Sequence, residues 1–201
     1  SKQSLEESVF SVKTDLIDMA DVELPLLGNY QIKNCVTVLE ACGVLRQRGL
    51  SLTEESIRKG LKKSHWAGRM EICGKAPLVL LDGAHNIDGI LQLSRSMHTY
   101  FENKKVTLIL GVLGDKEYTK MAEEILPIAD TVILTEPHSE RKLDAFSLAH
   151  SISSHTGTIY IEKETGKAYE KALSVTAKDG IILCCGSLYM IGAIRTYIMN
   201  R

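Results

Sequence analysis

The sequence predicts an α/β fold, a doubly wound and mostly parallel sheet that begins near residue 78 and carries helices on both faces. Short apolar runs of strand length alternate with segments whose apolar residues recur at helical spacing. The runs are continuously apolar, which is typical of parallel strands that are buried on both faces. Polar residues follow several of these runs, at the sheet edge where ligands bind in this fold class.

The expected elements alternate regularly from residue 77 to the end of the chain. They are strand 77–83, helix 87–101, strand 105–112, helix 118–130, strand 131–137, helix 144–157, strand 158–163, a helix around 168–173, strand 180–187 and a helix from 188. Asn86 is expected to cap the first of these helices and Asp144 the third, which Gly157 would end. Strands joined by helices imply right-handed crossovers and therefore a parallel sheet.

The first 64 residues do not follow this alternation. Residues 24–49 read as a loop and a long helix that Gly49 ends, and residues 53–63 as a second helix capped by Thr53. Two helices and a short strand-like start bury too little apolar surface for a stable domain. We therefore expect residues 1–64 to be the end of a preceding domain and residues 65–201 to be a second domain. The absence of an initiator Met favours the same interpretation.

Composition excludes several classes of function. The formal net charge is −1, so no broad basic face predicts binding to nucleic acid. No apolar run approaches the ~18 residues of a membrane span, and the N-terminus lacks the apolar core of a signal peptide. Five cysteines without a C-x-x-C pair indicate core packing in a reducing cytoplasm.

The nucleotide and metal motifs that are recognisable from spacing alone are absent. There is no G-x-x-x-x-G-K-[ST] phosphate loop, and "ETGKAYEKA" near Gly166 has the wrong glycine spacing and lacks the hydroxyl. No G-x-G-x-x-G follows the first strand of the sheet. No set of His and Cys residues has zinc spacing, so the residues predict no metal site.

Candidate ligand-binding residues follow four of the five expected strands. They are Asp82 and His85 after the first, Lys116 after the second, His138 and Arg141 after the third, and Ser187 and Tyr189 after the fifth. This mixture of cations, a carboxylate, imidazoles and hydroxyls suits an anionic or zwitterionic small molecule. A plainer interpretation stays open for each: His85 as a loop histidine, Asp115–Lys116 as a solvated turn, and Gly186–Ser187 as a helix start.

Five motifs in order carry a resemblance to a known family. "GNYQIKN", "WAGRMEI", "LLDGAHN", "GVLGDKE" and "GSLYMIG" resemble the folylpolyglutamate synthase/dihydrofolate synthase family, a branch of the Mur ligase superfamily. The resemblance covers the chain from about Leu24. It implies a Rossmann-like Mur ligase C-terminal domain at residues 65–201, preceded at residues 1–64 by the last helices of a central ATPase domain.

The resemblance also implies an activity. Enzymes of this family use ATP and Mg²⁺ to phosphorylate a substrate carboxylate, and the amine of L-glutamate then attacks the acyl phosphate to form an amide. The expected partners are therefore L-glutamate, a folate and the rest of the ATPase domain. The phosphate loop and most magnesium ligands would lie outside this chain, which should not catalyse the reaction alone.

Residue roles follow from the same resemblance. Asn34 resembles the family's adenine contact, Arg69 an arginine that reaches the nucleotide phosphates, and Asp82 a ribose contact that helps to join two domains. His85, Ser187 and Tyr189 resemble the lining of the glutamate subsite, with Asp82 and His85 as the catalytic pair. Lys116 and Arg141 are candidates for contacts with glutamate or folate carboxylates.

Departures from the family pattern leave alternatives open. Tyr30 stands where many relatives have His, and Cys35 follows Asn34 where Ala is usual. The second interpretation is a Mur-type ligase that adds an amino acid to a cell-wall precursor. The third is a non-enzymatic α/β module that binds a small acid.

Overall fold

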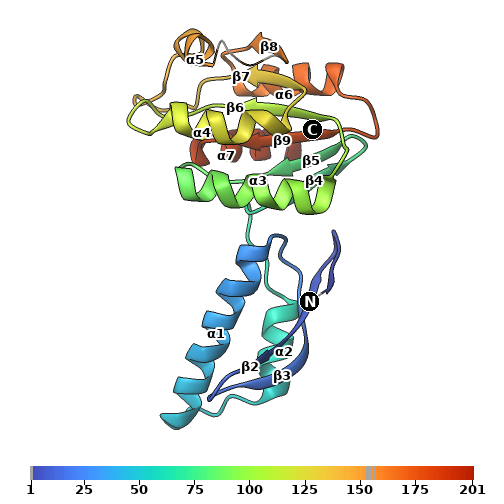
Figure 1. Cartoon of the computed structure of the whole chain (residues 1–201), viewed down its shortest axis with the longest axis vertical. Helices are drawn as coiled ribbons and strands as arrows, with labels where there is room; N and C mark the ends of the chain where they lie inside the picture. Colours follow the sequence, from blue (N-terminus) through green and yellow to red (C-terminus); the bar gives the residue numbers. More distant parts are fainter. Residues whose placement is uncertain (1, 153–154, 156) are drawn as a thin grey trace. The chain divides into compact units, whose positions relative to one another are not determined.

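The sheet predicted after residue 65 is present in the computed structural model, which describes residues 2–152, 155 and 157–201. Its strands are β4 (Glu71–Lys75), β5 (Leu78–Leu81), β6 (Val106–Leu110), β7 (Thr131–Leu134), β8 (Thr158–Ile161) and β9 (Ile181–Cys185). They are ordered β4-β5-β9-β6-β7-β8 (Figure 1). All neighbouring pairs from β5 to β8 are parallel, so the predicted fold class is confirmed.

Helices cover both faces of this sheet. They are α3 (Ile87–Phe101), α4 (Tyr118–Ile125) with the 3-10 turn η1 (Leu126–Ile128), α5 (Ala145–Ser151), α6 (Thr165–Val175) and α7 (Leu188–Met199). In Figure 1, α3 and α4 lie in front of the sheet, and α6 and α7 lie behind it. The α6 and α7 face is packed by buried side chains from alternate strand positions, among them Ile109, Ile182 and Cys184.

The helix starts follow the predicted capping chemistry. The side chain of Asn86 accepts from the N–H of Gly89 at 2.8 Å, and that of Asp144 accepts from the N–H groups of Phe146 and Ser147. The helix predicted over 144–157 ends earlier, at Ser151. Residues 153, 154 and 156 of that prediction lie outside the described residues.

One strand was missed in the sequence. The first expected strand was 77–83, but β4 begins earlier, at Glu71, and pairs antiparallel with β5. Its residues are only partly buried, because β4 is the edge strand, so it lacks the continuous apolar run that identified the others.

The chain divides into two compact units, Ser1–Ala67 and Gly68–Arg201. In the first unit, β1 (Lys2–Gln3), β2 (Ser8–Lys13) and β3 (Asp18–Leu24) form an antiparallel sheet that packs with α1 (Asn29–Gln47) and α2 (Glu54–Lys62). This unit has its own apolar core, which the expected two helices alone would not supply. Its buried members are Phe10, Val12, Ile17, Met19, Val22, Leu24, Cys35, Leu39 and Ile57.

As predicted, Thr53 caps α2, accepting from the N–H of Ser56 at 3.1 Å. Among the described helices of both units, none is long and apolar enough to cross a membrane.

Candidate functional site

Four loops meet at one edge of the large sheet and enclose a cavity of about 400 Å³. The loops follow β5, β9, β6 and β7, which are neighbours in the sheet, and each follows the carboxyl end of its strand. The lining residues are His85, Leu113, Lys116, Arg141, Gly186, Ser187, Leu188 and Tyr189. Five residues chosen from the sequence as candidate substrate-binding residues therefore share one cavity.

Gly186 makes the close approach of these loops possible. It has a φ of 108°, and its N–H donates to the carbonyl of Ala84 at 2.8 Å. A Cβ atom at this position would lie 2.7 Å from the carbonyl oxygen of Gly111. The loops after β5, β6 and β9 thus touch through their main chains, with no room for a side chain.

We expect Gly186→Ala to lower the free energy of unfolding by about 1–3 kcal/mol, because a positive φ strains an alanine and its methyl group meets the Gly111 carbonyl. Urea denaturation of this chain measures the change. Gly192→Ala is the matched control: it lies in α7 with open space around a new Cβ, so its stability should stay equal or rise by up to about 1 kcal/mol. Equal losses in both variants would contradict the packing described for Gly186.

His85 lines the cavity and keeps one ring nitrogen as an acceptor. Its Nδ1 lies 2.7 Å from the carbonyl oxygen of Gly83. Since a carbonyl oxygen only accepts, Nδ1 carries the proton in the neutral ring and Nε2 keeps its lone pair. No described residue hydrogen-bonds to Nε2, so this atom can take a proton from a ligand amine.

Ser187 places an unsatisfied hydroxyl at the start of α7. The residue is 1% exposed, and its Oγ has no hydrogen-bond partner among the described residues. It occupies the N-cap position without capping the helix, so the first-turn N–H groups also lack a side-chain acceptor. A helix N-terminus with a free hydroxyl can bind a carboxylate.

Lys116 and Arg141 add positive charge from two loops that pair with each other. Leu113 and Lys142 form an antiparallel bridge, and the N–H of Gly114 donates to the carbonyl of Arg141 at 2.8 Å. Arg141 Nη1 donates to Asp115 Oδ2 at 2.8 Å, so its charge is partly compensated. Lys116 has no carboxylate partner among the described residues and supplies the uncompensated cation.

Asp82 does not line the cavity and instead organises the chain beside it. It is 3% exposed, and its carboxylate accepts from the N–H groups of Met70 at 2.9 Å and Ala84 at 2.8 Å. The next residue, Gly83, donates to the carbonyl of Gly68 at 2.7 Å. These bonds hold both neighbours of Arg69, so Asp82 fixes the backbone that carries this arginine.

Asn34 lies in the first unit, on the exposed side of α1. Its Nδ2 donates to Oε1 of the buried Gln31 at 3.1 Å. It borders a largely apolar cavity of about 500 Å³ whose lining also includes Cys35 and Trp66. Asn34 is therefore held in a fixed orientation beside a cavity of its own unit.

Comparison with known proteins identifies the family. Residues 68–188 match the family model "Mur ligase, glutamate ligase domain". The chain belongs to the Mur ligase family. The folylpolyglutamate synthase of Lacticaseibacillus casei is 33% identical over 187 residues, which cover 90% of this chain and 41% of that protein.

Solved structures of Mur ligase relatives support the same family assignment. The folylpolyglutamate synthase of Thermotoga maritima gives a TM-score of 0.82 at 28% identity, over 99% of this chain and 45% of that one. That of Mycobacterium tuberculosis, complexed with ADP, gives a TM-score of 0.79 at 28% identity, over 89% of this chain and 42% of that one. The chain spans less than half the length of these relatives, and the predicted resemblance to the folylpolyglutamate synthase/dihydrofolate synthase branch is confirmed.

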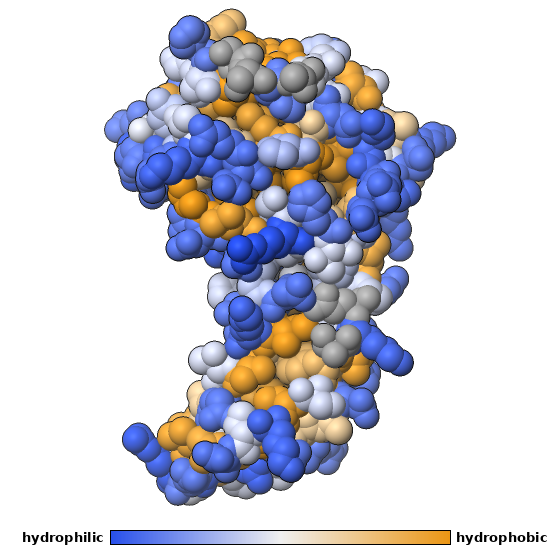
Figure 2. Space-filling view, in the orientation of Figure 1, coloured by the Kyte–Doolittle hydropathy of each residue, from blue (hydrophilic) through white to orange (hydrophobic). Residues whose placement is uncertain are grey.

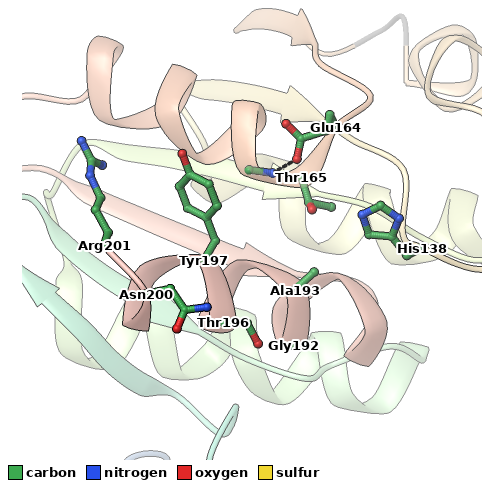
Figure 3. A pocket seen from close by; sticks show the side chains of 10 residues that line it. His138, Glu164, Thr165, Gly192, Ala193, Thr196, Tyr197, Asn200 and Arg201 are labelled. Carbon is green, nitrogen blue, oxygen red and sulfur yellow. Dashed lines mark hydrogen bonds between the residues drawn. The ribbon is translucent and has the colours of Figure 1, made fainter.

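A second hollow of the Mur ligase domain, about 640 Å³, lies between the start of α6 and the outer face of α7 (Figure 3). The carboxylate of Glu164 caps α6 by accepting from the N–H groups of Gly166 and Lys167, which occupies the place that a phosphate would need. Arg201, at its far end, pairs with Glu170 at 2.9 Å. This hollow does not suit an anion, which agrees with the sequence-based rejection of "ETGKAYEKA" as a phosphate loop.

The structure places two residues of this Mur ligase domain, His138 and Glu136, differently from the sequence-based description. His138 was expected at the shared edge, but it is exposed and borders the second hollow, not the cavity of about 400 Å³. Glu136 was overlooked although it is 7% exposed. An acidic residue inside the apolar run "TVILTEP" is a signal of a paired buried charge.

The cysteines of the Mur ligase domain are poor nucleophiles. Burial raises the pKa of Cys184 and Cys185 far above the ordinary value for a thiol. Burial, assisted by the nearby Glu71 carboxylate, raises the pKa of Cys73 to about 11. A thiol in this state stays protonated at neutral pH, so these residues serve packing.

Proposed function

We propose that this chain is the glutamate-binding part of an ATP-dependent ligase that joins L-glutamate to a folate. The observation that carries the proposal is the cavity of about 400 Å³, which combines an unsatisfied hydroxyl at a helix start, two cations and an imidazole acceptor. L-Glutamate has two carboxylates and one amine, and this set of groups complements all three. The names of the relatives support the same reaction class.

The cavity residues divide the recognition of L-glutamate among them. The start of α7 with Ser187 receives one carboxylate, and Lys116 with Arg141 receives the other. Nε2 of His85 accepts a proton from the amine, which must be neutral before it can attack a carbonyl carbon. Tyr189, exposed on the first turn of α7, flanks the cavity beside Ser187.

ATP is the proposed cofactor, and the chemistry of the residues proposed to contact it suits a purine ring and phosphates. Asn34 offers an oriented amide beside a largely apolar cavity, which suits a purine ring, and Arg69 offers a guanidinium on a segment that Asp82 holds. When bound, ATP supplies the phosphoryl group that activates the acceptor carboxylate.

The described residues contain no group of three or more His, Cys, Asp or Glu side chains that could hold a metal ion. We assign the proposed Mg²⁺ mostly to residues outside this chain.

The proposed domain assignment gives residues 1–64 to the end of the central ATPase domain and residues 65–201 to the glutamate-ligase domain. Apolar side chains at the surface of the first unit support the first half of this assignment (Figure 2). Val38 and Leu50 are each 51% exposed there. Exposed apolar surface of this kind is typical of a face that packs against further protein.

We propose a cytoplasmic location, which the free thiols support. The five cysteines of the sequence are free in the structure. Cysteines without disulfides are usual where cellular reductants keep thiols reduced.

We expect Lys116→Ala in the full-length protein that contains this chain to raise KM for L-glutamate about 10- to 100-fold. A hydrogen bond to a charged group contributes roughly 1.5–3 kcal/mol, and 1.36 kcal/mol corresponds to a factor of ten. Incorporation of labelled L-glutamate into tetrahydrofolate measures the change. Lys120→Ala is the control, because Lys120 pairs with Glu117 on the surface and does not line the cavity.

The same assay separates the proposed substrate class from its alternatives. Dihydropteroate, tetrahydrofolate and a nucleotide-linked cell-wall precursor are offered as acceptors in turn. We expect incorporation into a folate or pteroate acceptor, with ADP released in equal amount. Incorporation only into the cell-wall precursor would reassign the substrate, and L-glutamate binding without any ATP-dependent incorporation would favour a non-enzymatic module.

A further inference from the structure

A cluster of four charged side chains lies beside the cavity but outside it. Glu136 is 7% exposed at the end of β7, and its two carboxylate oxygens pair with Lys142 Nζ at 2.5 Å and Lys163 Nζ at 2.9 Å. Lys163 also pairs with Asp144 at 2.7 Å. The two positive and two negative charges cancel, so the cluster offers no net charge to a ligand.

The cluster closes the loop that carries Arg141. Glu136 precedes this loop, and Lys142 and Asp144 are close to its other end. The N–H of Ala145, the first residue of α5, also donates to Glu136 Oε1 at 3.3 Å. Asp144 in turn caps α5. One buried carboxylate therefore ties both ends of the loop to each other.

Lys142 and Arg141 are neighbours in the chain but border different hollows. Lys142 bridges Leu113 in antiparallel fashion, and Arg141 lies in the turn that the N–H of Lys142 closes on the carbonyl of Ser139 at 3.1 Å. Lys142 borders a separate hollow together with Glu136, whereas Arg141 lines the cavity of about 400 Å³. Holding Lys142 in place thus also fixes the turn that carries Arg141.

The carboxyl group of Glu136 is ionised when it pairs with Lys142 and Lys163. Burial acts to raise the pKa of its carboxyl, but hydrogen bonds from Lys142, Lys163 and the N–H of Ala145 outweigh burial and leave the pKa below its ordinary value. A buried carboxylate held by two lysines is strongly tied to its partners, because removing either partner leaves a charge without compensation.

We infer that Glu136, through Lys142, is a positioning residue that sets the guanidinium of Arg141 for binding of a ligand carboxylate. This inference rests on the proposed function, since it deepens the role of the same cavity as a subsite for L-glutamate. Glu136 itself does not touch the ligand and acts only through Arg141.

The test uses steady-state kinetics of the full-length protein that contains this chain. Glu136→Gln and Lys142→Met should each raise KM for L-glutamate about tenfold while KM for ATP and kcat change less than twofold. Lys142→Arg keeps the pairing and should retain most of the glutamate affinity. Asp130→Asn is the matched control, because Asp130 pairs with Lys105 and with the N–H of Val106 at the opposite edge of the sheet.

A double-mutant cycle with Arg141→Ala decides whether Glu136 acts through Arg141. Arg141→Ala alone should raise KM for L-glutamate tenfold or more, and adding Glu136→Gln should raise it less than twofold further. Additive effects, or an unchanged KM in folded Glu136→Gln and Lys142→Met, would overturn the inference. An unchanged KM in Arg141→Ala would instead overturn the proposed glutamate subsite, and the positioning role with it.

Discussion

Replacement of His85 by alanine is expected to lower kcat for L-glutamate incorporation about 100-fold or more in the full-length protein. A positioned general base contributes roughly 10²–10⁴-fold to a rate, and the geometry of His85 is that of a base. Its Nδ1–H is fixed by the Gly83 carbonyl at 2.7 Å, which leaves Nε2 as the acceptor of a residue that lines the cavity. The measurement is steady-state turnover with saturating ATP and folate.

Two further readouts distinguish this role from a structural one. Added imidazole should restore part of the turnover of His85→Ala, because the removed ring leaves space for it beside the amine. Affinity for ADP, measured by equilibrium titration, should stay the same. His138→Ala is the matched control, since His138 is exposed and does not line the cavity, and its turnover should equal that of the unchanged protein. Similar losses in both histidine variants would end the assignment of His85 as the base.

Asp82→Ala is expected to lower the free energy of unfolding by about 3 kcal/mol, the largest stability change anticipated for a single side chain near the site. The substitution leaves the buried N–H groups of Met70 and Ala84 without acceptors, and each such group costs roughly 1–3 kcal/mol. Chemical denaturation of this chain measures the loss. Asp88→Ala, an exposed carboxylate on the first turn of α3, should cost less than about 1 kcal/mol.

Asp82→Ala should also weaken nucleotide binding in the full-length protein. Without Asp82, one of the bonds that hold the neighbours of Arg69 is missing, so KM for ATP should rise while KM for L-glutamate changes less. Asp82→Asn tests the same point with less change in volume. The N–H groups of Met70 and Ala84 donate to different carboxylate oxygens, and an amide has an oxygen at only one of these two positions. A fully stable Asp82→Ala protein would contradict the role of Asp82 as an anchor.

Local patterns were sufficient to predict most of the elements in the second unit. Continuous apolar runs marked β5, β6, β7 and β9, and the caps at Asn86 and Asp144 marked where helices begin. These features depend on a residue and its near neighbours, so they are readable without knowledge of the fold. The edge strand β4 and the antiparallel sheet of the first unit escaped, because partly buried strands carry a weaker apolar pattern.

The candidate site was predictable in its membership but not in its roles. The residues that follow parallel strands had to share one edge of the sheet, so His85, Lys116, Arg141, Ser187 and Tyr189 could be grouped from their positions alone. Asp82 was chosen by the same rule, and the family resemblance gave it a ribose contact and a catalytic role, which stay predictions. Its burial and its bonds to Met70 and Ala84 indicate a positioning role as well, which no local pattern reveals.

The amino-acid sequence by itself determined the fold class, the order of helices and strands, and the chemical types gathered at the strand ends. Only the tertiary structure decided that β9 inserts between β5 and β6, which places Ser187 beside His85. It also decided that Glu136 closes the loop of Arg141 through lysines 142 and 163. The physical reason is that strand order and buried charge pairing depend on contacts between residues far apart in the chain, whereas propensity and capping act within a few residues.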